Sequence, residues 1–201
     1  MKDLKLMKYT GIGSRDAPET FRPLVFALGY YLASQGVGFL SGHAAGIDNW
    51  FEIATIAYSR DTGRPLRMRI SLPKEGFNGS WGLDKRTHIA IDPFHRAMAS
   101  TILKDSGVCT YLDRLPEYSQ LFFCRNVYQI IDFTMDFTGM VIFYAKENRE
   151  KGTVSGGTRI AVYLARHLGI PCYNLIFKED REALFKVIGF VPDPETIEKI
   201  E

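Results

Sequence analysis

Three glycine-containing turns carry residue types that could bind a phosphate group. They are Gly13-Ser14-Arg15, Ser41-Gly42-His43-Ala44-Ala45-Gly46 and Ser155-Gly156-Gly157-Thr158, and each follows a β-capable run and precedes a helical pattern. Glycine lets the backbone turn sharply and approach a ligand closely, and unpaired N–H groups at the start of a helix attract anions. Arg15 adds a fork-shaped positive charge to the first turn. Together the turns predict a cradle for the phosphate of a nucleotide or of a nucleic acid.

A second feature is the pair Arg125 and Asn126, which interrupts an apolar helical stripe within residues 118–133. A guanidinium is costly to bury without a partner. Arg125 should therefore face either an anionic ligand or a carboxylate such as that of Asp48. The predicted phosphate site accordingly includes Arg125 and Asn126 beside the three turns.

The sequence leaves any catalytic residue unknown, but His43, Asp48 and Glu52 are candidates for acid–base chemistry. His43 and Asp48 have simpler explanations as well, because Asp48 can cap a helix or bond to a neighbouring turn and His43 can be a hydrogen-bonded loop residue. No cluster of histidine, cysteine and carboxylate residues has the sequence spacing of a metal site. The turns lack the full dinucleotide fingerprint and a Walker lysine, so the sequence predicts neither a metal nor a cofactor.

Alternating strand and helix patterns must position these turns. Strands are expected at 7–12, 37–40, 67–72, 140–145 and 172–177, and helices at 20–35, 47–58, 92–105, 118–133, 158–168 and 180–187. The first helix should begin directly after its turn, with Asp16 as N-cap and Pro18 in the first turn. Residues 73–87 form a glycine-rich, aromatic loop that either covers a site or only packs its own Phe77 and Trp81.

This order predicts an α/β protein with a Rossmann-like, doubly wound and mostly parallel sheet in one domain. The domain should span residues 1–190, followed by a charged C-terminal tail at 191–201. Ligands of such sheets bind beyond the carboxyl ends of the strands, where the winding direction reverses. All three turns leave strands at that edge, so they are expected to converge on one crevice.

Composition limits the class of protein. The 201 residues include 46% hydrophobic and 24% charged residues, and the net charge of +2 is too small to indicate a nucleic-acid binder by itself. Cys109, Cys124 and Cys172 are widely spaced, which favours reduced and mostly buried thiols. The first residues lack a signal-peptide core, and no apolar run is long enough to span a membrane. A cytoplasmic location is expected.

The ordered motifs resemble the DprA/Smf family of DNA-processing proteins, within the wider SLOG superfamily. The resemblance rests on the three turns, on Asp48, on Phe122-Phe123-Cys124-Arg125-Asn126 and on Ala161 and Ala165 after the third turn, and it covers about residues 7–177. The chain resembles in particular the short, single-domain forms that are often carried by phages, which would act in the host cytoplasm. The resemblance implies a homodimer that binds single-stranded DNA and passes it to a recombinase, with Ser14, Arg15, Arg125 and Asn126 in the phosphate pocket.

Two other functions from the same superfamily stay open. Phosphoribohydrolases, which cleave the base from a nucleoside monophosphate, share the glycine turns but carry a glutamate just after one of them. Here Gly156-Gly157-Thr158 is followed by Arg159, Ile160 and Ala161, with no acid. Hydrolysis would then need Asp48 or Glu52. The third alternative is a module that senses or sequesters a nucleotide signal.

Overall fold

The computed structural model describes residues 8–201 and contains one six-stranded parallel sheet. The strands are β1 (Lys8–Gly13), β2 (Gly38–Ser41), β3 (Met68–Leu72), β4 (His88–Ala90), β5 (Met140–Tyr144) and β8 (Cys172–Asn174). Their order across the sheet is β4-β3-β2-β1-β5-β8. The winding direction therefore reverses between β1 and β5, as a doubly wound Rossmann-like fold requires.

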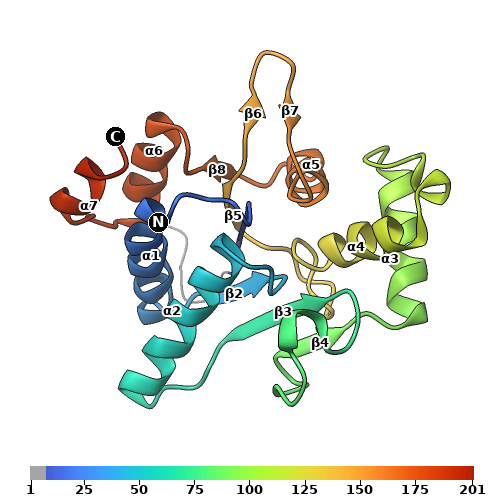
Figure 1. The fold of residues 1–201 in the computed structure, drawn as a ribbon, viewed down its shortest axis with the longest axis horizontal. Coiled ribbons are helices and arrows are strands. Elements are labelled where there is room, and N and C mark those ends of the chain that lie inside the picture. Colours follow the sequence, from blue (N-terminus) through green and yellow to red (C-terminus); the bar gives the residue numbers. More distant parts are fainter. Residues whose placement is uncertain (1–7) are drawn as a thin grey trace.

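Helices cover both faces of this sheet (Figure 1). They are α1 (Arg22–Ser34), α2 (Ile47–Thr62), α3 (Pro93–Asp105), α4 (Glu117–Val127), α5 (Arg159–His167), α6 (Lys178–Ile188) and α7 (Pro194–Glu198). One hydrophobic core contains the buried sides of α1, α2 and α6, and a second contains those of α3, α4 and α5. The predicted three-layer α/β architecture is confirmed.

Strand β5 shows why the sequence folds in this way. Val141, Ile142 and Phe143 are completely buried, and Ile142 belongs to one core while its two neighbours belong to the other. Successive side chains of a strand point to opposite faces, so a continuous apolar run suits only a strand covered on both sides. β5 pairs with β1 and β8, which places it inside the sheet.

The first helix begins later than expected, and the prediction of Asp16 as its N-cap is wrong. Pro18 has an extended backbone (φ −58°, ψ 136°), a short 3-10 turn spans Glu19–Phe21, and α1 starts only at Arg22. Pro23 lies in the first turn of α1, where a missing N–H costs nothing. The first glycine turn is therefore followed by an extended segment and not by a helix N-terminus.

Other boundaries also differ from the predicted ones. The helix expected at 118–133 ends at Val127, Tyr128 to Ile130 continue as turns, and Ile131 forms an isolated β-bridge with Phe137. Three short strands were missed. One is β4 at the sheet edge, and the others are β6 (Glu147–Asn148) and β7 (Thr153–Val154), which form an antiparallel hairpin that projects away from the sheet in Figure 1. Strands of two or three residues carry too little periodicity to be recognised from sequence.

The cysteines and the C-terminal segment complete the fold. Cys109 and Cys124 are buried, Cys172 is half-buried, and none of the three forms a disulfide. Beyond residue 190, α7 contacts α1, and Ile197 and Ile200 pack against the first core. Among residues 8–201, no helix is both long enough and apolar enough to cross a bilayer.

Candidate phosphate-binding crevice

A crevice of about 640 Å³ opens where β1 and β5 end, at the reversal point of the sheet. The first turn lines it with Gly13, Ser14 and Arg15, and the third turn lines it with Ser155, Gly156, Gly157 and Thr158. The second turn contributes Ala44 and the adjoining Asp48, and α4 contributes Arg125 and Asn126. The predicted convergence of the turns and of the Arg125 helix on one crevice is thus present in the fold.

Arg125 is the buried cation of this crevice. Its side chain is only 5% exposed, and its Nε atom has no hydrogen-bond partner among the described residues. The guanidinium lies over the rings of Phe122 and Phe77, at 5.5 and 5.9 Å from their centroids. Burial lowers the pKa of Arg125 to about 10, and the nearby charge of Asp48 opposes that shift, so the group stays protonated at neutral pH.

Gln129 bonds to the guanidinium of Arg125, and Gly42 leaves the space that the guanidinium occupies. In the amide orientation that satisfies its neighbours, Gln129 accepts from Arg125 Nη1 at 3.0 Å and donates to Asn126 Oδ1 at 3.0 Å. A Cβ atom on Gly42 would lie 1.3 Å from Arg125 Nη1. Only glycine leaves room there, so this residue serves the close approach of a side chain and not the turn alone.

Asp48 joins the first turn to the second. Its Oδ1 accepts from Gly13 N at 2.9 Å and its Oδ2 accepts from Gly42 N at 3.2 Å. Burial raises the pKa of Asp48 above its ordinary value, while Arg125 and the donated N–H bonds act in the opposite direction. No described carboxylate, Asp48 included, forms an ion pair with Arg125. The bond of Asp48 to neighbouring turns is one of the two alternatives that the sequence left open.

Gly46 brings the second turn against the first. Its φ is +79°, and a Cβ atom there would lie 2.5 Å from the carbonyl oxygen of Ser14. The third turn is tied in from the other side, because Asn126 Nδ2 donates to Gly157 O at 2.8 Å. Asn126 therefore positions a turn, whatever else it contacts.

Four of the residues predicted for the phosphate site do not line the crevice: Ser41, Gly42, His43 and Gly46. Ser41 is fully buried, and its Oγ donates to Gly11 O at 2.7 Å, which fixes β2 to β1. His43 belongs to another group of side chains, and its Nδ1 lies 2.8 Å from Glu52 Oε2. Adjacent residues of one turn thus face different surroundings, which the sequence did not indicate.

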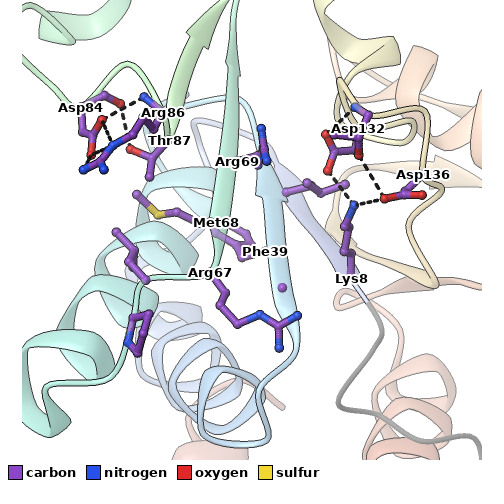
Figure 2. A pocket seen from close by; sticks show the side chains of 15 residues that line it. Lys8, Phe39, Arg67, Met68, Arg69, Asp84, Arg86, Thr87, Asp132 and Asp136 are labelled. Atoms are coloured by element: carbon purple, nitrogen blue, oxygen red, sulfur yellow. Dashed lines mark hydrogen bonds and ion pairs between the residues drawn. The ribbon is translucent and has the colours of Figure 1, made fainter.

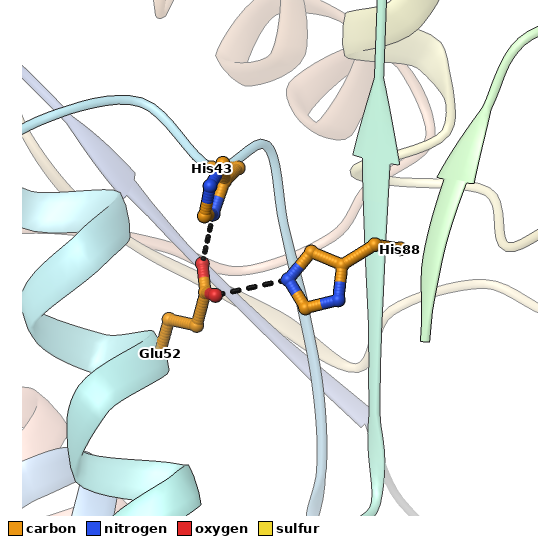
Figure 3. A group of neighbouring side chains, drawn as sticks. All are labelled: His43, Glu52 and His88. Atoms are coloured by element: carbon orange, nitrogen blue, oxygen red, sulfur yellow. Dashed lines mark hydrogen bonds and ion pairs between the residues drawn. The ribbon is translucent and has the colours of Figure 1, made fainter. Parts of the chain in front are cut away.

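His43, Glu52 and His88 form a separate cluster (Figure 3). Glu52 accepts from His43 through one carboxylate oxygen, and its other oxygen lies 3.0 Å from His88 Nε2. The hydrogen bond to Glu52 raises the pKa of His43. Burial pushes the pKa of Glu52 upward, but the bonds to both histidines outweigh it and leave that pKa below its ordinary value. His88 stands 36 residues from Glu52, so sequence spacing could not reveal the group.

Sequence reasoning also missed residues of the crevice itself. Gln129, Lys146, Tyr144 and Asp16 line it as well. Gln129 lies four residues after Arg125, which would have indicated a shared face had the helix continued. Lys146 lies two residues after the end of β5, and its position after the central strand was the available signal.

A larger hollow of about 750 Å³ lies at the opposite edge of the sheet, where the strands begin (Figure 2). Lys8 Nζ contacts Asp132 Oδ2 at 2.6 Å and Asp136 Oδ2 at 2.9 Å. Arg86 is likewise paired with Asp84, at 2.8 Å. Because carboxylates already neutralise Lys8 and Arg86, the larger volume of this hollow does not make it a better anion site than the crevice.

Replacing Gly42 with alanine should disturb the crevice more than its one methyl group suggests. The new Cβ would overlap Arg125 Nη1, so the guanidinium must move, and overpacking of this kind costs about 1–3 kcal/mol of stability. Urea denaturation measures the loss. Gly157→Ala is the control for folding, because no atom lies within 4 Å of its added Cβ. Equal stability of the two variants would contradict the described position of Arg125.

The motifs that carry the DprA/Smf resemblance can now be located. Ser14, Arg15, Arg125 and Asn126, which the resemblance assigns to a phosphate pocket, all line the crevice. In comparisons with known proteins, no protein-family model, no curated protein and no solved structure matches the chain.

Proposed function

We propose that the crevice binds the phosphate groups of single-stranded DNA or of a nucleotide, in the manner of a DprA-like protein, and breaks no bond. The observation that carries this proposal is Arg125, a buried guanidinium whose Nε lacks a partner among the described residues. Such a charge is costly in an apolar interior unless an anion compensates it. A phosphate oxygen offers the charge and the hydrogen-bond acceptor that Arg125 lacks.

The rest of the lining supports an anionic ligand. Arg15 and Lys146 are exposed on the crevice rim, and together with Arg125 they supply three cations. Of the two lining carboxylates, Asp48 is occupied by backbone N–H groups, and Asp16 is exposed at the mouth. The turn at Gly156 and Gly157 is solvent-exposed beside these cations and could approach a sugar-phosphate closely.

Both carboxylates considered for the hydrolase alternative are engaged in other hydrogen bonds. Asp48 accepts two backbone bonds and Glu52 bonds two histidines outside the crevice, so neither is free to activate water. Asp16 is the carboxylate that remains beside the ligand space. Cleavage of an N-glycosidic bond would therefore require Asp16, which gives this alternative its own test.

The wider DprA-like role follows from the resemblance and belongs to the same proposal. It includes a homodimer, transfer of single-stranded DNA to a recombinase and a place in the cytoplasm, that of the host for a phage-encoded protein. The alternative of a nucleotide sensor uses the same crevice but needs only a mononucleotide. Ligand length separates the two, because a strand contacts more cations than one nucleotide does.

The test is a titration of labelled oligodeoxynucleotides and of mononucleotides at several salt concentrations. If a single strand neutralises Arg15, Arg125 and Lys146, the logarithm of the affinity should fall with the logarithm of salt concentration with a slope of about −2. Arg15→Ala should lower the affinity and flatten this slope. Arg60→Ala is the matched control, since Arg60 is exposed and paired with Asp61.

Each outcome decides between the functions. Affinity that rises with oligonucleotide length supports the DNA-binding role, and length-independent affinity for mononucleotides supports the sensor. Release of free base from nucleoside monophosphates, abolished by Asp16→Asn, would establish the hydrolase instead. Absence of binding to every nucleotide and oligonucleotide would overturn the proposal.

A further inference from the structure

The cluster of His43, Glu52 and His88 assembles donor atoms from three separate parts of the fold. His43 belongs to the second turn, Glu52 to α2 and His88 to the first position of β4. One ligand atom from each residue lies within 4.8 Å of the others. The side chains of Glu52 and His88 are each 5% exposed, and that of His43 is 12% exposed. In Figure 3 both imidazole rings point toward the carboxylate of Glu52.

Both ring nitrogens of His88 have a partner. Thr87 Oγ1 lies 3.0 Å from His88 Nδ1 and also bonds Asp84 O at 2.9 Å. On the other side of the ring, His88 Nε2 faces Glu52 Oε1 at 3.0 Å. In the tautomer that carries its proton on Nδ1, Nε2 presents the lone pair that a metal ion requires.

We propose that His43 Nδ1, His88 Nε2 and the carboxylate of Glu52 form a site for a divalent transition metal such as Zn²⁺. Two imidazoles with one carboxylate are a donor set that suits zinc and its neighbours, whereas Mg²⁺ and Ca²⁺ prefer oxygen alone. Ligands of a tetrahedral ion, with bonds of about 2.1 Å, lie about 3.4 Å apart. The N–O separations of 2.8 and 3.0 Å are slightly shorter, so small movements of the side chains would bring the donor atoms to that spacing.

The surroundings of the cluster also fit a metal site. The contact between His88 Nδ1 and Thr87 Oγ1 is of the kind that orients a ligating histidine from outside the metal site. His43 has a left-handed backbone (φ +56°), which is costly for a residue other than glycine. Asn78 Nδ2 donates to His43 O at 2.8 Å and holds that conformation. The partial exposure of His43 leaves a path for the ion and a coordination position for water.

Metal binding is measured directly on the whole protein, purified without an affinity tag and stripped with a chelator. The probes are Zn²⁺ by calorimetry and Co²⁺ by its visible absorption, with elemental analysis of the protein before stripping. We expect one ion per chain and a rise in the melting temperature on Zn²⁺ addition. His88→Asn and Glu52→Gln should each weaken Zn²⁺ binding about 100-fold or more.

His167→Asn is the matched control, because His167 is an exposed histidine at the end of α5 and should leave Zn²⁺ affinity unchanged. Co²⁺ titration of the unaltered protein keeps the test valid even where a variant fails to fold. A stripped protein that binds neither Zn²⁺ nor Co²⁺ would overturn the proposal. The same holds if the His88 and His167 variants bind Zn²⁺ equally well. In either case the cluster is a hydrogen-bonded group of Glu52 and two histidines that holds no metal ion.

Discussion

Replacing Arg125 with methionine should abolish most of the affinity for phosphate-bearing ligands while leaving the protein about as stable as before. Loss of a buried, charge-assisted contact weakens binding by about 2–5 kcal/mol, which is at least about 30-fold. Stability should hold because methionine removes a buried charge that no described carboxylate pairs, and it retains contact with Phe77 and Phe122. Oligonucleotide titration and urea denaturation measure the two effects separately.

Arg181 provides the matched comparison for that experiment. It is equally buried, at 4% exposed, but its Nη1 donates to Leu175 O at 3.0 Å and to Ile176 O at 3.1 Å. Arg181→Met should therefore lower the free energy of unfolding by about 1–3 kcal/mol, because it leaves buried carbonyl groups without donors. It should not change ligand affinity. If Arg125→Met destabilises the protein as much and binding persists, Arg125 is a structural residue and the proposed function fails.

Replacing Asp48 with asparagine should cause the largest loss of stability of any substitution in the crevice. The carboxylate accepts from Gly13 N and Gly42 N through different oxygens, and an amide must turn an NH₂ group toward one of those donors. The substitution also removes the negative charge nearest to Arg125. Leaving a buried N–H group without its charged acceptor costs about 3 kcal/mol or more, which urea denaturation would detect.

Asp61→Asn is the control on the same helix, because Asp61 is exposed and its change should stay within about 0.5 kcal/mol. A stable Asp48→Asn protein that has lost an enzymatic activity would point to the catalytic role of Asp48 instead. An unchanged Asp48→Asn protein would mean that the two turns are held together by other contacts.

The sequence predicted those parts of the fold that long apolar patterns determine. The continuous run of β5 and the helical stripe of α2 identified their elements because burial on two faces, or on one stripe, leaves a period in the residues. Asp16 and Pro18 led to a wrong predicted start for the first helix, because their pattern resembles a helix cap even where the chain stays extended. The short β4 forms by pairing with β3, a tertiary contact that leaves no local period.

The crevice was predictable in part for a related reason. Arg125 was recognisable because a charge inside an apolar stripe needs a compensating partner. Neither the role of Gly42 nor that of Gln129 could be read from the sequence, because each depends on the position of one guanidinium in space. The left-handed backbone at His43, which is unusual for a histidine, was not predictable either.

Asp48 and Glu52 lie one helical turn apart on α2, and each belongs to a different cluster. A rigid helix cannot shift one of these carboxylates without shifting the other. If both proposals hold, occupancy of the histidine cluster and occupancy of the crevice are thermodynamically linked. Any factor by which Zn²⁺ changes the affinity for a nucleotide must then equal the factor by which that nucleotide changes the affinity for Zn²⁺.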